Sequence, residues 1–400
     1  MRAVSTTTRI RRPHLTTVRR DDDRVSPLEL FFDLVFVLAL TQCTALMADE
    51  PTWTGLAKGV AILAVMWWAW VGYTWLCSVV NPEEGSVRLV MFTAMAALLV
   101  VALAIPDAFG EDALIFALAY GIVRAMQVAL LVIAGREDEG LRHSSTGLAV
   151  STAIGVGLLT AASFADGELQ GVLWGIAIVL DVGGPMVIDS SGWRLMPEHF
   201  AERHGLIVII ALGESIVAIG VGAEVVGITA GVIAATVFGI AVAGALWWLY
   251  FDVVALVAAR RLENAKPGKE QNEIARDSYS YLHFAMVAGI VLLALGLKKT
   301  LEHTGDALKW VPATALLGGT AIYLLAHVAF RWRNIHTLNR QRLAMAIVLP
   351  LLIPVAHALP SLATLGGLAA LLVGLVAYET IRYGETRERL RRRLLHGETG

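Results

Sequence analysis

The sequence predicts an all-α polytopic membrane protein with about twelve transmembrane helices, arranged as two parallel six-helix repeats. Its 400 residues are 56% hydrophobic and 16% charged, with a mean hydropathy of +0.65. A chain of this composition is too apolar for a soluble globule and too long for a single anchor. Apolar stretches of about 20 residues, the length needed to cross the hydrocarbon, recur along it. Its basic residues also favour one side of the membrane.

The predicted spans account for most of the chain. The eighth is longer than a membrane requires, so we expect it to tilt, kink or extend into water at its end. The repeats are expected over 26–190 and 191–382, between a basic, disordered cytoplasmic tail over 1–25 and a second basic cytoplasmic tail over 383–400. The spans lie near 28–47, 56–78, 88–105, 112–134, 147–165, 171–189, 204–222, 228–258, 278–297, 311–330, 342–358 and 363–381.

The basic residues give the orientation. With the N-terminus inside, Arg124 falls within a span and, of the 32 lysines and arginines, only Lys58, Lys298, Lys299 and Lys309 fall outside. The positive-inside rule then places both termini in the cytoplasm. The expected partners are the lipid bilayer, anionic lipid headgroups at the basic tails, a small solute or ion, and a second copy in a homo-oligomer. Nucleic acid is not expected.

The first span carries two carboxylates, Glu29 and Asp33, four residues apart. An ionised acid in hydrocarbon costs about 2.5–3.5 kcal/mol on insertion scales, so such a residue is a functional-site hypothesis. The spacing puts both acids on one helix face. The orientation places Glu29 at the cytoplasmic mouth and Asp33 about 6 Å deeper.

Three charged residues fall near the middle of later spans: Arg124 in the fourth, Asp181 in the sixth and Glu214 in the seventh. We expect Arg124 to pair with Asp181 or Glu214. One reading is a fixed ion pair that sets helix register. The other starts from charge balance, because one arginine leaves acids such as Asp33 without a basic partner. A buried, unpaired acid tends to take up a proton, which is what a coupled transporter uses.

The seventh span follows a polar segment that contains Glu202, Arg203 and His204. Glu214 and Ser215 lie deeper in the same span, by about 18 Å from the start of this segment. The segment is either an interfacial helix start or an entry vestibule that leads to a buried acid.

An internal repeat is predicted from pairs of similar segments. Trp67-Trp68 in the second span matches Trp247-Trp248 in the eighth, and Glu29 matches Glu202 by position. A repeat of six spans restores the orientation, so the halves should be parallel. The alternative is chance likeness among Ala-, Leu- and Val-rich helices.

The sequence contains no Ser/His/Asp set, no metal-ligand spacing and no nucleotide-binding Gly-rich loop. We therefore expect neither an enzyme nor a cofactor or metal site. Both cysteines, Cys43 and Cys77, are expected to be buried free thiols.

Two motifs, SPLELFFDLVFV at 26–37 and ERHGLIVIIALGESI at 202–216, resemble the bacterial low temperature requirement protein A family over roughly residues 24–385. The resemblance implies that the protein lies in a bacterial cytoplasmic membrane. The family name implies growth at low temperature and no reaction. Phe31-Phe32-Asp33 is also similar to a Phe-Ser-Asp motif of the endolysosomal potassium-channel family. The seventh span lacks that pattern, which argues against a symmetric pore.

The leading functional hypothesis is a transporter or permease with its pathway between the two halves, coupled through Asp33 and Glu214 to protons or cations. The alternatives are a cation channel-like protein and a structural or sensory membrane protein without a pathway. Convergence of the polar residues on a cavity would favour transport, and dispersal into pairs would favour a structural role. The predicted pathway residues are Glu29, Asp33, Arg124, Asp181, Glu202, Arg203, His204, Glu214 and Ser215.

Overall fold

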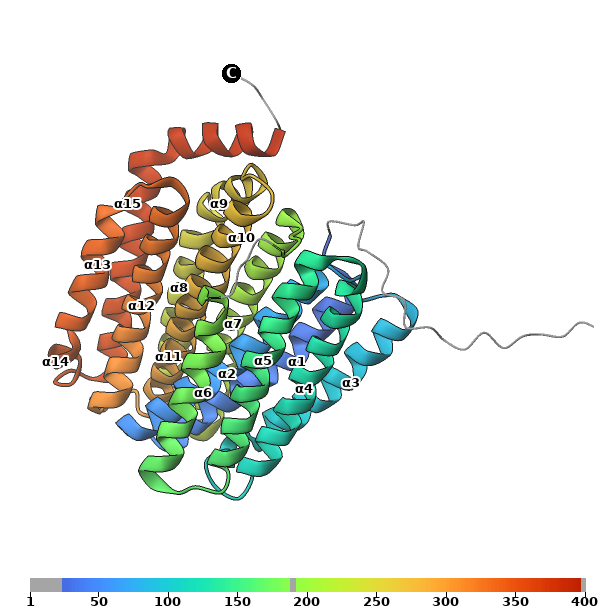
Figure 1. The fold of residues 1–400 in the computed structure, drawn as a ribbon. Coiled ribbons are helices and arrows are strands. Elements are labelled where there is room, and N and C mark those ends of the chain that lie inside the picture. Colours follow the sequence, from blue (N-terminus) through green and yellow to red (C-terminus); the bar gives the residue numbers. More distant parts are fainter. Residues whose placement is uncertain (1–23, 188–191, 397–400) are drawn as a thin grey trace, which may run out of the picture.

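The computed structural model describes residues 24–187 and 192–396, which form a bundle of helices (Figure 1). Most of the predicted N-terminal tail, and residues 397–400 of the C-terminal one, lie outside the described residues. The helices are α1 (Pro27–Asp49), α2 (Trp53–Cys77), α3 (Gly85–Ala104), α4 (Ala113–Ala134), α5 (Glu139–Ala162), α6 (Gly167–Val187), α7 (Pro197–Val226), α8 (Ala230–Phe251), α9 (Val254–Glu263), α10 (Lys269–Ile274), α11 (Leu282–Glu302), α12 (Trp310–Ile335), α13 (Arg340–Leu351), α14 (Ile353–Ala356) and α15 (Ser361–His396). A π-helical segment, η3 (Ala275–Tyr281), joins α10 to α11.

Within this part of the chain, eleven helices are long and apolar enough to cross a membrane. The remaining predicted span, 342–358, is split into α13 and α14 around Leu352. Pro350 lies inside the end of α13 and Pro354 at the start of α14. Proline lacks the N–H of a helical hydrogen bond, which explains the break. Figure 1 shows that the two pieces together return the chain from the end of α12 to the start of α15.

Local sequence explains how two important helices begin. Ser26 caps α1 by accepting from the backbone N–H of Glu29, and the Glu29 carboxylate accepts from the N–H of Ser26, which is a capping box. Pro197 occupies the first turn of α7, where its missing N–H has no cost. As a result α7 begins at Pro197, seven residues before the predicted start at 204, and the polar segment belongs to the helix.

The long eighth span bends as expected. It is divided into α8 and α9 at Asp252 and Val253. The last helix, α15, is also longer than a membrane requires, and Figure 1 shows its final part turned across the end of the bundle.

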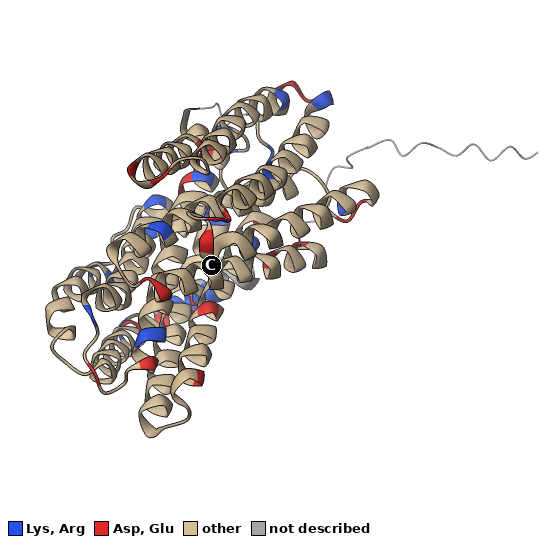
Figure 2. Ribbon diagram, turned by 90° about the horizontal axis from the view of Figure 1, so that it is seen from below, with Lys and Arg blue, Asp and Glu red and all other residues tan. Residues whose placement is uncertain are grey.

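Three helices, α2, α11 and α12, form the most buried part of the bundle, whereas α5 and α6 have the smallest share of buried residues among the candidate spans of the described chain. Large apolar side chains such as Leu34, Leu89 and Val179 are exposed on the outside. This arrangement suits a lipid solvent, in which the outer surface is as apolar as the core. Most of the ribbon in Figure 2 carries neither acidic nor basic residues, as the composition requires.

The internal repeat stays a prediction. Helix α1 packs against α2 and α3, and α7 packs in the same way against α8 and α11. The two tryptophan pairs differ, however, because Trp67 and Trp68 are buried whereas Trp247 and Trp248 are about four-tenths exposed. The tryptophan pairs therefore do not occupy equivalent environments.

Candidate functional site

A buried ionic cluster joins α1 to α7. The guanidinium of Arg203 donates to the carboxylates of both Asp33 and Glu29, with the Glu29 contact at 3.3 Å. The Nε2 atom of His199 lies 2.7 Å from Glu29 Oε1, and the indole N–H of Trp70 donates to Asp33 Oδ1 at 2.8 Å. Both acids and Arg203 are fully buried. The expectation that Asp33 has no basic partner is therefore wrong.

The other two residues of the predicted polar segment face different surroundings. Glu202 is exposed, and its carboxylate accepts from the backbone N–H of Val25 at 3.2 Å. His204 is buried, with Nδ1 bonded to the Phe200 carbonyl and its ring 5.0 Å from that of Trp70. Glu29 and Glu202 thus do not share a role at equivalent helix starts, because one is buried in an ion pair and the other is on the surface.

A second buried ion pair joins α4 to α6. Arg124 Nη2 lies 2.9 Å from Asp181 Oδ1 and donates to Thr152 on α5 at 2.8 Å. Its Nη1 donates to the carbonyl of Trp68 at 3.2 Å, and Tyr120 donates its hydroxyl proton to Asp181 Oδ2 at 3.0 Å. The expectation that Arg124 pairs with Asp181 or Glu214 is confirmed for Asp181.

Glu214 belongs to neither cluster. Its carboxylate accepts a hydrogen bond from Thr41 on α1 at 2.5 Å, and the residue is 1% exposed. In the described part of the chain, no lysine, arginine or histidine lies within ion-pair distance of Glu214. The neighbouring Ser215 is buried, and its hydroxyl has no hydrogen-bond partner among the described residues. The predicted pathway residues therefore fall into three separate groups, and Glu202 lies outside them on the surface.

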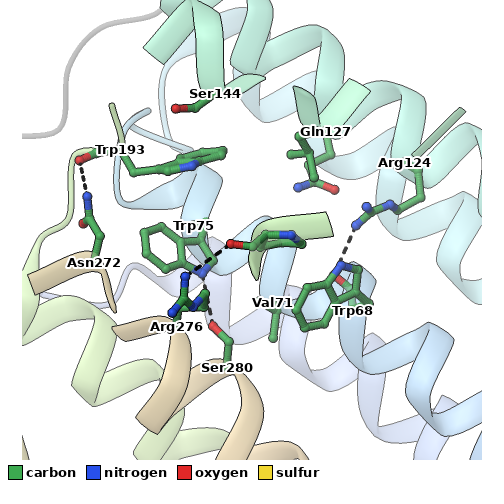
Figure 3. Close-up of a pocket in the computed structure, with 13 residues that line it drawn as sticks. Trp68, Val71, Trp75, Arg124, Gln127, Ser144, Trp193, Asn272, Arg276 and Ser280 are labelled. Atoms are coloured by element: carbon green, nitrogen blue, oxygen red, sulfur yellow. Dashed lines mark hydrogen bonds between the residues drawn. The ribbon is translucent and has the colours of Figure 1, made fainter. Parts of the chain in front are cut away.

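A cavity of about 60 Å³ lies beside the second ion pair (Figure 3). We call it the indole cavity, because Trp68, Trp75 and Trp193 line it. Figure 3 shows Gln127 and Arg124 on one side and Trp75 and Trp193 on the other. Its other polar lining residues are Ser144, Asn272, Arg276 and Ser280.

A smaller cavity of about 10 Å³, the inner cavity, lies on the other side of the same ion pair. Trp68 lines both cavities, Arg124 lines the indole cavity and its partner Asp181 lines the inner one. The order along the helices agrees. On each of the four helices, the residues that line the inner cavity are displaced along the helix from those that line the indole cavity. The inner cavity is lined by Ala64 and Val65 on α2, Tyr120 on α4, Gly155 on α5 and Ala177 on α6. The indole cavity is lined by Val71 and Trp75 on α2, Gln127 on α4, Ser144 on α5 and Pro185 on α6.

The segment η3 closes the indole cavity from the side of the second half of the chain. Its Ser280 carbonyl accepts from the indole N–H of Trp67 at 2.8 Å, and its hydroxyl accepts from that of Trp75 at 3.2 Å. Arg276 donates to the Pro185 carbonyl at 3.4 Å. Single π-helical turns are found frequently at functional sites. The sequence does not predict this π-helical segment, although the tryptophans of α2 that it contacts are conspicuous in the sequence.

Fold and site together define a multi-pass, all-α membrane protein with buried polar groups and internal cavities. The chain belongs to the family described as bacterial low temperature requirement A protein (LtrA), whose profile matches residues 24–377. It is 32% identical over 319 residues to an uncharacterized protein of Rhizobium meliloti (strain 1021). The aligned region covers 76% of this chain and 76% of that relative. No solved structure matches the chain.

Proposed function

We propose that this membrane protein transports a small polar solute along a path between the four helices α2, α4, α5 and α6. The observation that carries the proposal is the alignment of two cavities on either side of the Arg124–Asp181 ion pair. In this proposal the pair and the ring of Trp68 form the barrier between them. This location replaces the earlier hypothesis of a pathway between the two halves, because both cavities are lined mainly by helices of the first half.

The two cavities together cover a substantial depth. Their lining on α2 runs from Ala64 to Trp75, which is about 16 Å of helix. That is roughly half of the hydrocarbon thickness. Because α2 spans Trp53–Cys77, this lining reaches from the middle of the helix to its C-terminal end, and a solute that crosses the barrier would cover that half of the membrane.

Size and chemistry limit the proposed solute. A water needs roughly 10–15 Å³ of such cavity volume, so the indole cavity at about 60 Å³ holds a few waters or a solute of similar size. Both arginines that line it already contact acids, Arg124 with Asp181 and Arg276 with Asp277. The buried amide of Gln127 has no hydrogen-bond partner among the described residues, at either its oxygen or its nitrogen. These features favour a neutral solute that both donates and accepts hydrogen bonds.

For ion coupling, the contacts favour Glu214 over Asp33. Asp33 accepts from Arg203 and Trp70, whereas Glu214 contacts a neutral hydroxyl of α1. We keep Glu214 as the residue that takes up a proton or cation during transport. We also propose that the protein lies in a bacterial cytoplasmic membrane with both termini in the cytoplasm, and that it has no enzymatic activity.

A structural role without a pathway is the second hypothesis. The pairing of Asp33 with Arg203 and of Asp181 with Arg124 favours it, because fixed ion pairs specify how helices associate. The two hypotheses differ in whether water reaches the cavities.

Cysteine labelling tests the choice. The buried Cys43 and Cys77 are replaced by alanine, and a single cysteine is introduced as Ser144→Cys in the indole cavity or Ala177→Cys in the inner one. Membrane-impermeant methanethiosulfonates are then added from one side of proteoliposomes. Transport predicts that the two positions react, and from opposite sides.

The control is Val172→Cys on α6, whose side chain is 54% exposed on the outer surface and should stay unreactive in lipid. If neither cavity position reacts while a cysteine in a loop does, the pathway is wrong and the structural hypothesis stands.

Flux is measured by stopped-flow light scattering of proteoliposomes in urea or glycerol. Trp68→Ala should accelerate swelling by opening the barrier. Trp247→Ala, which removes a tryptophan that is 44% exposed on α8, is the matched control and should leave the rate unchanged.

A further inference from the structure

A pocket of about 400 Å³ opens at the end of the bundle where α8 gives way to α9, α12 ends, and α13 begins. We call it the arginine pocket, because Arg260, Arg331, Arg342 and Arg387 line it. It shares no lining residue with the indole cavity or the inner cavity, and its lining residues come from the second half of the chain. An inference about it is therefore independent of the proposed transport pathway.

The arginines are not equally neutralised. Arg342 forms a two-point contact with Glu379, at 2.9 and 2.7 Å. Arg387 contacts Asp252 at 2.9 Å and also Glu379. These two cations and two acids balance, so the carboxylate of Asp252, which lines the pocket, is already compensated.

Arg331 is different. Its Nε donates to the hydroxyl of Thr337 at 2.9 Å, and among the described residues no carboxylate lies within ion-pair distance of it. Arg260 contacts Glu263 at 2.6 Å, but that pair is about half exposed, and such pairs contribute little. The pocket therefore carries an excess positive charge centred on Arg331.

The backbone adds a second feature suited to an anion. Helix α9 begins at the wall of the pocket, which is lined by its first residue, Val254, and by Val253 just before it. Among the residues that the structure describes, no side chain caps this helix start, so its first N–H groups stay available to an anionic ligand.

The apolar part of the wall indicates where the anion comes from. Ile335 and Leu338 line the pocket and are 36% and 47% exposed, and Tyr383 on α15 lines it at 40% exposure. Exposed apolar residues and a tyrosine at the end of the spans are typical of the membrane interface. A lipid can place its phosphate at Arg331 and its acyl chains along these residues.

We propose that the arginine pocket binds the phosphodiester headgroup of an anionic lipid, with Arg331 as the main contact. Basic pockets between transmembrane helices bind such headgroups in the same way. The pocket is a defined site, in contrast to diffuse attraction between the basic tails and the membrane surface.

Lipid titration of the purified full-length protein in a neutral detergent tests this proposal. Binding of phosphatidylglycerol is followed by native mass spectrometry, with phosphatidylcholine and inorganic phosphate as the other two ligands. We expect saturable binding of phosphatidylglycerol, weaker binding of phosphatidylcholine, and no competition by inorganic phosphate at equal concentration. Equal competition by inorganic phosphate would overturn the lipid assignment.

Arg331→Gln should raise the dissociation constant for phosphatidylglycerol about fivefold, and Arg331→Lys should restore most of the affinity. The matched control is Arg340→Gln, which removes an exposed arginine at the start of α13. A monodisperse gel-filtration profile shows that each variant is folded. If Arg331→Gln and Arg340→Gln weaken binding equally, the attraction is diffuse and the proposed site does not exist.

Discussion

Gly72 on α2 lies directly against the amide of Gln127 on α4. A Cβ atom at Gly72 would come within 2.2 Å of Gln127 Nε2. The absence of a side chain at this position therefore lets the amide occupy the wall of the indole cavity, where it has no hydrogen-bond partner in the described part of the chain. The glycine and the glutamine form one unit of the proposed site.

Gly72→Ala should push the Gln127 amide out of its position. We expect a loss of about 1–3 kcal/mol in the free energy of unfolding, as for other overpacked cores, and slower urea flux. Unfolding is followed by SDS titration, with a thiol-reactive dye that reports exposure of Cys43 and Cys77. Gly72→Ala combined with Gln127→Ala should recover the stability. Gly244→Ala, where a Cβ meets no atom within 4 Å, should be neutral or slightly stabilising.

Arg124→Gln should destabilise the protein by about 3–5 kcal/mol, because it leaves Asp181 buried without its partner. The double replacement Arg124→Met with Asp181→Leu should cost less than either single change. Both are measured by the same SDS titration. The control is Arg194→Gln, which breaks the ion pair with Asp138 at a site where the arginine side chain is 59% exposed, and which should cost less than about 1 kcal/mol. Equal losses for Arg124→Gln and Arg194→Gln would contradict this account.

Arg203→Gln should also cost about 3–5 kcal/mol, since Glu29 and Asp33 would lose the guanidinium that contacts both of them. Asp33→Asn introduced into that variant should restore part of the loss by removing one of the two charges. Glu202→Gln is the neighbouring control, because Glu202 is exposed and contacts a backbone N–H. Thermal unfolding in detergent, followed by tryptophan fluorescence, measures all three. A destabilised Glu202→Gln would show that the helix start matters and the ion pair does not.

Glu214→Gln should leave stability nearly unchanged, because the amide oxygen can still accept from Thr41. It should abolish any proton movement that accompanies uptake of urea or glycerol. Proton movement is measured with a pH-sensitive dye trapped in proteoliposomes, with Glu202→Gln as the control. Unchanged proton movement in Glu214→Gln would remove this residue from the coupling scheme.

The sequence predicted the class of fold because hydrophobic composition and span length are local properties. It did not predict the partner of Asp33, because the predicted seventh span begins at His204 and leaves Arg203 in a cytoplasmic loop. The residues before His204 are polar, so the hydrophobic pattern does not show that the helix begins at Pro197. Pro197 was a usable signal, since proline is frequent in the first turn of a helix. Likewise, Pro350 could have predicted the break between α13 and α14.

The cavities could not be predicted in this way. The indole cavity depends on how α2 packs against η3, which comes from about 200 residues later in the chain, as the contact between Trp67 and Ser280 shows. Such packing depends on helix rotation and not on composition. Sequence reasoning did single out Arg124 and Asp181, because charges in the middle of a span are conspicuous.

The π-helical turn has a consequence for helix phase. Each residue of an α-helix advances the side-chain direction by about 100°, so the extra residue of a π-turn offsets the two flanking segments by about that angle. Upstream of the offset, Asn272 on α10 lines the indole cavity, and downstream of it Met286 and Ile290 pack in the buried core. Deleting one residue of η3 would rotate one of these faces out of position. The seven-residue segment thus lets a single continuous helix present two differently oriented faces to its neighbours.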